Sequence, residues 1–223
     1  MFILPANPQA ILWDLDGTIV DTKDCHFHTW QIALEKHGFS IKRSLFEMNF
    51  GRNNMTSLPN YLGFQPDAEL ASEIIKHKET LFRQFVQREV TLVPGVEAWL
   101  ASANRMNIAQ AIASSAPMEN ITDVLKHFSL DTYFKLFVSG VDLPAKPEPD
   151  IFLQTASRLG YQPRECLVIE DSVAGVKAAK NAGMMCVAVT TSYQRDKLAL
   201  ADLVVDTFQI PLDKAKNALY GSC

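Results

Sequence analysis

Cysteine and histidine are scarce in this chain of 223 residues, with four and five copies. The cysteines, Cys25, Cys166, Cys186 and Cys223, lie far apart, and the sequence has neither a CxxC pair nor a histidine cluster. This spacing predicts no zinc site and no disulfide framework, and we expect reduced thiols. Cys166 and Cys186 lie inside apolar runs, so we interpret them as small core residues, because a reactive thiolate needs an electropositive setting.

The chain also lacks an excess of positive charge. Lysine and arginine number 21 against 25 aspartates and glutamates, which gives a formal net charge of -4. Proteins that bind nucleic acid neutralise many phosphates with clustered lysine and arginine. The charge balance therefore argues against nucleic acid as a partner.

Long hydrophobic runs are missing as well. No stretch approaches the roughly 20 apolar residues of a membrane span. The segment "MFILPANPQ" has no basic region, and its apolar run is too short for a signal peptide. We therefore expect a cytoplasmic monomer that does not enter a membrane. The length suits one large core, or a core with a smaller module.

What the chain does contain is an alternation of short apolar runs and helix-like segments. The runs are "AILW" (10–13), "NIAQAIA" (107–113), "LFVSG" (136–140), "CLVI" (166–169), "MCVAV" (185–189) and "LVV" (203–205). Runs that are apolar on both faces are typical of parallel strands covered by helices on each side. Segments such as Asp150 to Leu159, which stops at Gly160, predict the helices between them. The alternation predicts an α/β fold with a doubly wound parallel sheet.

Residues 23–90 have a different sequence pattern, without an apolar run comparable to those of the predicted strands. Apolar residues recur there at helical spacing in two stretches. These residues are Trp30, Ala33 and Leu34 in the first stretch and Leu70, Ile74, Leu81 and Phe85 in the second. We therefore predict a core domain formed by residues 1–21 and 93–223, interrupted by a helical cap domain at residues 22–92.

Polar side chains follow four of the predicted core strands. They are Asp14 and Asp16, then Ser114 and Ser115, then Lys146 within "AKPEPD", and finally Glu170 and Asp171. In open parallel sheets, ligands bind beyond the carboxyl ends of the strands. Carboxylates, a hydroxyl and an amine are thus expected at one edge of the sheet.

Several carboxylates at one dry edge would repel each other and raise each other's pKa, unless a cation lies among them. We expect Asp14 and Asp171 to share Mg2+, which suits an all-oxygen site that also binds substrate phosphate. Gly17 would let the strand unwind after Asp14, so that Asp14 and Asp16 approach one ligand. One carboxylate can then attack while the other transfers protons.

Four motifs carry a family resemblance. "DLDGT", a serine after the second core strand, "KPEPD" and "EDSVAG" resemble, in order and across nearly the whole chain, the motifs of the haloacid dehalogenase superfamily of phosphotransferases. A helical insertion directly after the first motif resembles the cap of the subgroup that contains β-phosphoglucomutase and small sugar-phosphate phosphatases. Each motif alone is weak evidence, but all four in order are very specific.

The resemblance implies a role for each matched residue. Asp14 would be the nucleophile that forms an aspartyl-phosphate. Asp16 would be the general acid for the leaving alkoxide and then the base that activates water. Mg2+, Lys146 and Ser114 would stabilise charge on the transferring phosphoryl oxygens.

The resemblance also implies the metal ligands. Asp14 and Asp171 would hold the ion, together with the main-chain carbonyl of Asp16 and with Glu170 as a further candidate. Thr18 would offer a hydroxyl or amide to the phosphate or to its loop.

Candidate substrate-binding residues in the cap are His26, Gly51 and Arg52, with Ser115 facing them from the core. His26 aligns with a histidine that couples cap closure to acid and base work in sugar-phosphate mutases; a packing or surface role is the alternative. "NFGRNN" around Gly51 resembles the substrate loop of the cap. Arg52 would bind an anionic or hydroxylated part of the substrate, or else be an exposed structural arginine.

Two further residues have local structural roles in our interpretation. Ser172 and Asp150 each stand at the start of a predicted helix, where a short polar side chain can accept a hydrogen bond from the first turn. We expect both to be N-caps.

Departures from the mutase pattern decide between two activities. Phe50 and Asn54 stand where mutases carry a lysine and an arginine, and Ala116 and Pro117 replace their serine and lysine. The groups that would hold a second phosphate are absent, which favours a phosphatase of small phosphomonoesters such as sugar or polyol phosphates. A β-phosphoglucomutase-type mutase is the alternative. A dehalogenase would not keep Asp16, and a binding protein without catalysis would lose one of the four core groups.

Overall fold

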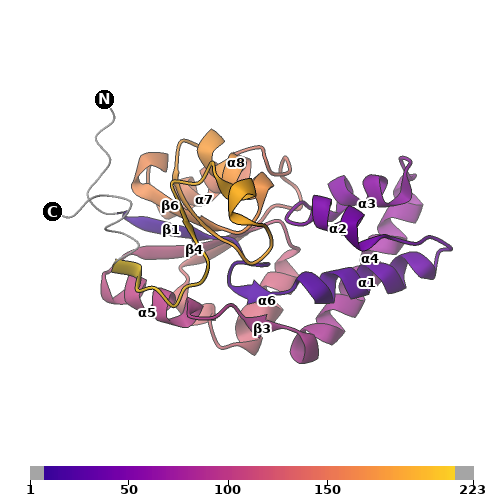
Figure 1. Cartoon of the computed structure of the whole chain (residues 1–223), viewed down its shortest axis with the longest axis horizontal. Helices are drawn as coiled ribbons and strands as arrows, with labels where there is room; N and C mark the ends of the chain where they lie inside the picture. The colour runs from indigo at the N-terminus through magenta and orange to yellow at the C-terminus, as the bar shows by residue number, and fades with distance from the viewer. Residues whose placement is uncertain (1–7, 214–223) are drawn as a thin grey trace.

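The computed structural model describes residues 8–213 of the chain (Figure 1). Cys223 and most of the segment "MFILPANPQ" lie outside this range, so nothing is added to the expectations for them. Within the described range, no helix combines the length and the apolar character needed to span a membrane.

A six-stranded parallel sheet forms the centre of the molecule, with the strand order β5-β4-β1-β6-β7-β8. Its strands are β1 (Ala10–Trp13), β4 (Ala109–Ser114), β5 (Leu136–Ser139), β6 (Cys166–Glu170), β7 (Met185–Val189) and β8 (Leu203–Val205). Every predicted apolar run forms a strand, which confirms the doubly wound α/β fold. Ser114 and Glu170, expected just after their strands, are in fact the last residues of β4 and β6.

Helices cover both faces of this sheet (Figure 1). They are α5 (Val96–Arg105) and α6 (Met118–His127) on one face, and α7 (Asp150–Leu159) and α8 (Val173–Asn181) on the other. Ile11 and Trp13 of β1 pack with the first pair, whereas Ala10 and Leu12 pack with the second. Because both faces are buried, the strands are apolar throughout rather than alternating.

Four helices are inserted between β1 and α5 and form a separate lobe (Figure 1). They are α1 (Lys23–Glu35), α2 (Arg43–Asn49), α3 (Asn54–Leu62) and α4 (Ala68–Glu89). A short antiparallel pair, β2 (Val20–Asp21) and β3 (Thr91–Leu92), lies where the chain leaves and re-enters the sheet domain. The four helices enclose their own apolar cluster around Trp30, Phe46 and Ile74. The cap domain at residues 22–92 stays our assignment.

The sequence analysis missed two helices of this lobe, and it placed the start of one strand of the core too early. Helices α2 and α3 were not predicted, because seven and nine residues are too short to show a repeating apolar stripe. The run at 107–113 begins as a strand only at Ala109, because Asn107 has a left-handed backbone (φ 57°) that ends the turn after α5.

The two predicted helix caps have different outcomes. Ser172 Oγ accepts a hydrogen bond from the Gly175 N–H at 3.0 Å, so this N-cap is confirmed. The N-cap assigned to Asp150 is wrong, because α7 is capped by Pro149 and Asp150 is its first residue. Proline, with its fixed φ, is already suited to a helix start, and Asp150 instead places a negative charge in the first turn.

The described cysteines behave as core residues. Cys25, Cys166 and Cys186 are all buried and form no disulfide. Burial raises the pKa of the Cys166 thiol to about 12. A thiol of this kind stays protonated, which fits the predicted packing role.

Candidate active site

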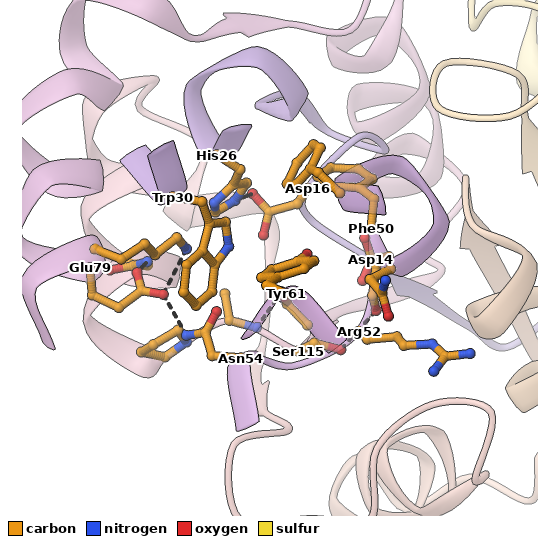
Figure 2. Close-up of a pocket in the computed structure, with 18 residues that line it drawn as sticks. Asp14, Asp16, His26, Trp30, Phe50, Arg52, Asn54, Tyr61, Glu79 and Ser115 are labelled. Atoms are coloured by element: carbon orange, nitrogen blue, oxygen red, sulfur yellow. Dashed lines mark hydrogen bonds and ion pairs between the residues drawn. The ribbon is translucent and has the colours of Figure 1, made fainter. Parts of the chain in front are cut away.

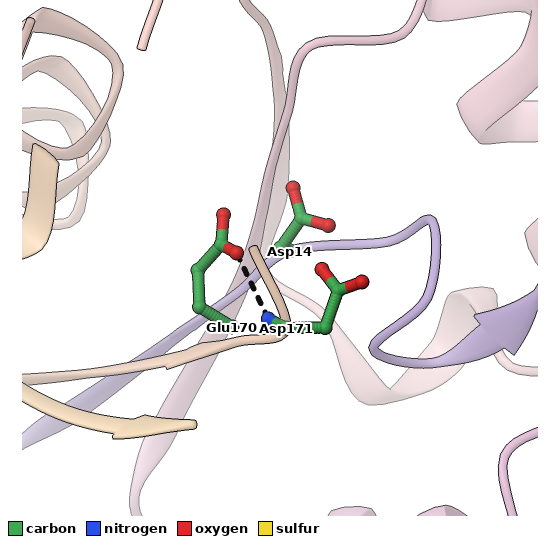
Figure 3. A group of neighbouring side chains, drawn as sticks. All are labelled: Asp14, Glu170 and Asp171. Carbon is green, nitrogen blue, oxygen red and sulfur yellow. Dashed lines mark hydrogen bonds between the residues drawn. The ribbon is translucent and has the colours of Figure 1, made fainter. Parts of the chain in front are cut away.

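Three buried carboxylates meet at the carboxyl end of β1 and β6 (Figure 3). Asp14, Glu170 and Asp171 each contribute an oxygen that lies within 4.8 Å of the oxygens from the other two. The register of the sheet explains this meeting, since Trp13 pairs with Ile169 and the Asp14 N–H donates to the Ile169 carbonyl at 3.0 Å. The predicted gathering of these side chains at one edge of the sheet is therefore observed.

Lys146 is the only cation in direct contact with these carboxylates among the described residues. Its Nζ donates to Asp14 Oδ1 and to Glu170 Oε1, each at 2.6 Å. The ammonium and both acceptors are almost completely buried. Burial lowers the pKa of Lys146, but Asp14 and Glu170 raise it more, so the pKa lies above its ordinary value. Lys146 is thus charged and fixed beside Asp14.

Glu170 has both of its oxygens occupied. Oε1 accepts from Lys146, and Oε2 accepts from the N–H groups of Asp171 and Ser172 at 2.9 and 2.8 Å and from Ser172 Oγ at 2.9 Å. A carboxylate used in this way positions Lys146 and the start of α8. These contacts do not favour Glu170 as a direct metal ligand.

The site carries more negative than positive charge. Burial raises the pKa of Asp14 to about 8, despite the opposing contact with Lys146. Burial, followed by the charge of Glu170, raises the pKa of Asp171 well above its usual range. Three carboxylates facing one ammonium leave uncompensated charge, which a divalent cation would neutralise.

The donor set fits a hard divalent cation. Asp171 Oδ2 is buried and has no hydrogen-bond partner among the described residues, while Asp171 Oδ1 accepts from Thr18 Oγ1 at 3.4 Å. Lys146 uses Oδ1 of Asp14, which leaves Oδ2 for another ligand. The backbone of Gly17 (φ 83°) passes so close that a Cβ there would collide with Asp171 Oδ2. Oxygen donors with an excess of negative charge suit Mg2+.

Asp16 turns its carboxylate toward the first cap helix. Oδ1 accepts from Thr22 Oγ1 at 2.8 Å and contacts His26 Nε2 at 3.1 Å. Burial raises the pKa of Asp16, but the charge and hydrogen bond of His26, with that of Thr22, lower it more, so the net pKa is below the ordinary value. The Asp16 side chain is engaged with Thr22 and His26, so the metal contact from its main-chain carbonyl stays a prediction.

His26 is buried within the site and is not a surface residue. Its ring stacks on Phe82 of α4, with centroids 4.2 Å apart and planes 5° from parallel. It therefore combines packing with a direct contact to Asp16; its role in acid and base work stays a prediction.

The remaining predicted residues lie at the junction of core and cap. Ser114 is buried at the end of β4, where its Oγ accepts from the Ala116 N–H at 3.1 Å. Ser115 Oγ donates to the Gly51 carbonyl at 3.3 Å, so this serine joins the core to the cap loop. Arg52 is exposed, and its guanidinium extends away from the side of the pocket where Trp30 lies (Figure 2).

A pocket lies between the sheet edge and the cap, and it contains two charged residues that sequence reasoning missed (Figure 2). Lys78 and Glu79 of α4 are both buried there and form an ion pair at 2.8 Å. A signal was present: Lys78 lies four residues after Ile74 and four before Phe82, so a charge interrupts the apolar stripe of the helix.

The positions that depart from the mutase pattern also line this pocket. Phe50 is buried in the cap cluster, and Asn54 Nδ2 donates to Glu79 Oε1 at 2.6 Å. Ala116 and Pro117 face them from the core. None of these four positions carries a cation.

The fold and the site together define a class of protein: an α/β enzyme with an acidic, lysine-containing centre at the carboxyl edge of its sheet, covered by helices inserted after the first strand. The chain belongs to the haloacid dehalogenase-like hydrolase family, whose model matches residues 11–189. The family that the four motifs resemble is thereby confirmed.

Relatives and solved structures agree with this membership. The chain is 34% identical over 190 residues to a putative phosphatase, YhcW, of Bacillus subtilis, covering 81% of this chain and 83% of that protein. It is 31% identical over 213 residues to hexitol phosphatase A of Escherichia coli, covering 94% and 96%. It is 32% identical over 206 residues to beta-phosphoglucomutase of Bacillus subtilis, covering 88% of each. A crystal structure of beta-phosphoglucomutase from Clostridium difficile superposes with a TM-score of 0.86 at 27% identity, covering 95% and 97%.

Proposed function

We propose that this protein is a Mg2+-dependent phosphatase that hydrolyses a small sugar or polyol phosphate through an aspartyl-phosphate on Asp14. The observation that carries the proposal is the contact between Lys146 Nζ and Asp14 Oδ1 at 2.6 Å, beside the unpartnered Oδ2 of Asp171. A carboxylate held next to a fixed ammonium can attack a phosphoryl group whose charge the same ammonium offsets. Relatives named as phosphatases support this class of reaction.

The residues suited to hold Mg2+ are Asp14 and Asp171, with the main-chain carbonyl of Asp16. When bound, the ion would offset charge on the transferring phosphoryl oxygens. Glu170 would act indirectly, because its contacts position Lys146 and the backbone at Asp171. Thr18 would orient Asp171 through its hydroxyl rather than bind substrate.

In the first half of the reaction, a carboxylate oxygen of Asp14 attacks phosphorus while the bond from phosphorus to the ester oxygen breaks. Asp16 gives its proton to the departing alkoxide, so that an alcohol leaves. Lys146 and the Ser114 hydroxyl hold the transferring phosphoryl oxygens. The pair of carboxylates thereby replaces one difficult displacement by two easier ones.

In the second half, Asp16 takes a proton from water, and the water oxygen attacks phosphorus. The bond from phosphorus to Asp14 breaks, which releases inorganic phosphate and restores the carboxylate. The contact with His26 Nε2 lowers the pKa of Asp16, which favours the ionised form that accepts the proton from water in this half. In the first half Asp16 must instead carry the proton that it donates, so it acts as the acid only when it is protonated as the substrate binds. His26 is thus a positioning and tuning residue for Asp16.

A phosphoglucomutase-type activity is the second candidate. One relative and one similar solved structure that are named beta-phosphoglucomutase support it. A mutase must rebind a bisphosphorylated intermediate in reverse orientation, which requires cations for the phosphate that is not transferred. Phe50, Asn54 and Pro117 offer none. These substitutions favour hydrolysis.

A screen of phosphorylated metabolites, with released inorganic phosphate as the readout, tests the proposal. We expect hexose, pentose and polyol monophosphates to rank highest, and a chelator to stop turnover until Mg2+ is restored. Absence of phosphate release from every phosphomonoester would contradict the proposal. The cytoplasmic location, the monomeric state and the lack of nucleic-acid binding stay predictions.

A further inference from the structure

The buried carboxylate of Glu79 lies in the wall of the pocket, on the side away from Asp14 (Figure 2). Its oxygens accept hydrogen bonds from three different elements. Oε1 accepts from Asn54 Nδ2 of α3 at 2.6 Å and from Lys78 Nζ of α4 at 2.8 Å, and Oε2 accepts from Asn120 Nδ2 of α6. Glu79 therefore joins the cap to the core and is held in one position.

Glu79 is ionised and offsets the charge of Lys78. Burial raises the pKa of Glu79, but the charge of Lys78, then that of His26, and the hydrogen bonds lower it more, so the pKa is below its ordinary value. The ion pair leaves Lys78 without a surplus charge for an anionic ligand.

Two further buried basic groups at or beside the pocket have partners, whereas Arg52, which also lines the pocket, is exposed. His26 contacts Asp16, and Lys146 contacts Asp14. Among the described residues that line the pocket, each buried cationic or imidazole group therefore has a carboxylate partner. Arg52 does not change this balance beside Glu79, because its guanidinium extends away from Glu79 (Figure 2). A second phosphate or a carboxylate on a substrate would be desolvated beside Glu79 with no surplus cation on that side of the pocket, which is costly.

Hydroxyl groups, in contrast, suit this wall. A carboxylate offers about four lone-pair sites and an ammonium three donors, so Glu79 and Lys78 retain hydrogen-bonding capacity beyond their present contacts. Asn54 uses its Nδ2 on Glu79, which leaves its carbonyl oxygen as an acceptor. Trp30 and Tyr61, whose rings meet edge to face at 5.2 Å, supply an apolar surface beside these groups for the C–H faces of a sugar or polyol.

We infer that Glu79, held by Asn54 and Asn120, is a specificity-determining residue that selects hydroxyl-rich monophosphates and rejects substrates with a second anionic group. The inference rests on the proposed phosphatase function, because it concerns the substrate side of the same pocket. It attributes the low affinity that we expect for a second phosphate to a carboxylate that is present, and not only to the lysine and arginine that Phe50 and Asn54 replace.

Glu79→Gln tests the inference, because it keeps the shape and removes the charge. Sorbitol 6-phosphate and glucose 6-phosphate are the hydroxyl-rich monophosphates. Fructose 1,6-bisphosphate and phosphoglycolate are the esters with a second anionic group. Acetyl phosphate, an acyl phosphate rather than an ester, has neither feature. Without its partner, the Lys78 ammonium becomes available to an anion. We expect the ratio of kcat/KM for the monophosphates to kcat/KM for the bisphosphate to fall about tenfold or more. The kcat/KM for the monophosphates should fall, and that for the bisphosphate should rise.

Glu73→Gln, an exposed position on the same helix, is the matched control and should keep the wild-type ratio. Thermal unfolding of both variants reports on folding, and Asn54→Ala, which removes one donor to Glu79, should shift the ratio in the same direction.

An unchanged ratio in a folded Glu79→Gln protein would overturn the inference while leaving the phosphatase proposal intact. If the wild type releases phosphate from none of these compounds, acetyl phosphate included, the phosphatase proposal itself fails.

Discussion

The Nε2 atom of His26 lies 3.1 Å from Oδ1 of Asp16 and ties the first motif of the core to the first helix of the cap. Each residue is also held by a second contact: His26 stacks on Phe82, and Asp16 accepts a hydrogen bond from Thr22. The charge state of the proposed acid and base therefore depends on a residue of the cap.

His26→Gln should raise the pKa of Asp16, because the largest influence that lowers it is removed. The part of the kcat profile that requires ionised Asp16 should move to higher pH, and kcat at neutral pH should fall roughly tenfold. His28→Gln is the control, since His28 is exposed on the same helix and contacts Glu89. An unmoved pH profile in His26→Gln would contradict the tuning role.

Arg52→Ala should change the ranking of substrates or raise KM about tenfold, with a smaller effect on the best kcat, because Arg52 lies on the cap side of the pocket. Arg88→Ala, at an exposed position of α4, is the control for lost surface charge. Steady-state kinetics on several substrates provide the measurement. An equal loss of kcat for every substrate would instead place Arg52 in the chemical step.

Removing the metal should make stability depend on pH. In the metal-free protein the pKa of Asp14 is raised to about 8, and that of Asp171 is raised too. An unfolded aspartate ionises near 3.8, so the folded state binds more protons between about 4 and 8 and loses stability as the pH rises through this window. The stabilisation by Mg2+ should therefore grow with pH.

Thermal unfolding with a chelator or with Mg2+ at pH 5.5 and 8 measures this effect. We expect a larger Mg2+-induced rise in Tm at pH 8, of a few degrees, since about 1 kcal/mol shifts Tm by roughly 2–4 °C in a chain of this size. Asp171→Asn should abolish the Mg2+ effect and should raise the Tm of the metal-free protein at pH 8. An identical Mg2+-induced rise in Tm at both pH values would contradict the claim that uncompensated carboxylate charge destabilises the metal-free site.

Phosphatase and mutase activities can be separated with β-glucose 1-phosphate and a bisphosphate activator. We expect steady release of inorganic phosphate and little glucose 6-phosphate, because no cation is present at Phe50, Asn54 or Pro117 to hold a second phosphate. Conversion much faster than phosphate release would favour the mutase, and Arg52 would then be the first residue to test as the missing cation.

The sequence predicts the sheet and the groups at its edge well, for physical reasons. Strands buried on both faces must be apolar throughout, so their runs stand out, and polar residues directly after them must lie at the ligand-binding edge. Asp14, Lys146 and Asp171 meet as expected. That both carboxylate oxygens of Glu170 are occupied by hydrogen bonds could not be predicted, because two of these bonds come from the N–H groups of the residues that follow it.

The cap is less predictable. Its helices pack on one another through single faces, and α2 is only seven residues long, so no periodic pattern marks it. Glu79 was missed because its partners Asn54 and Asn120 lie 25 and 41 residues away in the sequence, on other helices. Contacts of that kind arise only from the packing of the cap against the core.

The central claim, that Asp14 is the nucleophile, is tested most directly by the rate of phosphate release from Asp14→Asn with saturating Mg2+ and the best substrate of the screen. Asp21→Asn, at an exposed carboxylate nearby, is the control and should keep wild-type turnover. We expect Asp14→Asn to fold as the wild type does, judged by its Tm, and to lose activity by a factor of about 10⁴ or more, because the amide cannot form the acyl-phosphate. Turnover near the wild-type rate in the Asp14→Asn protein would contradict the account.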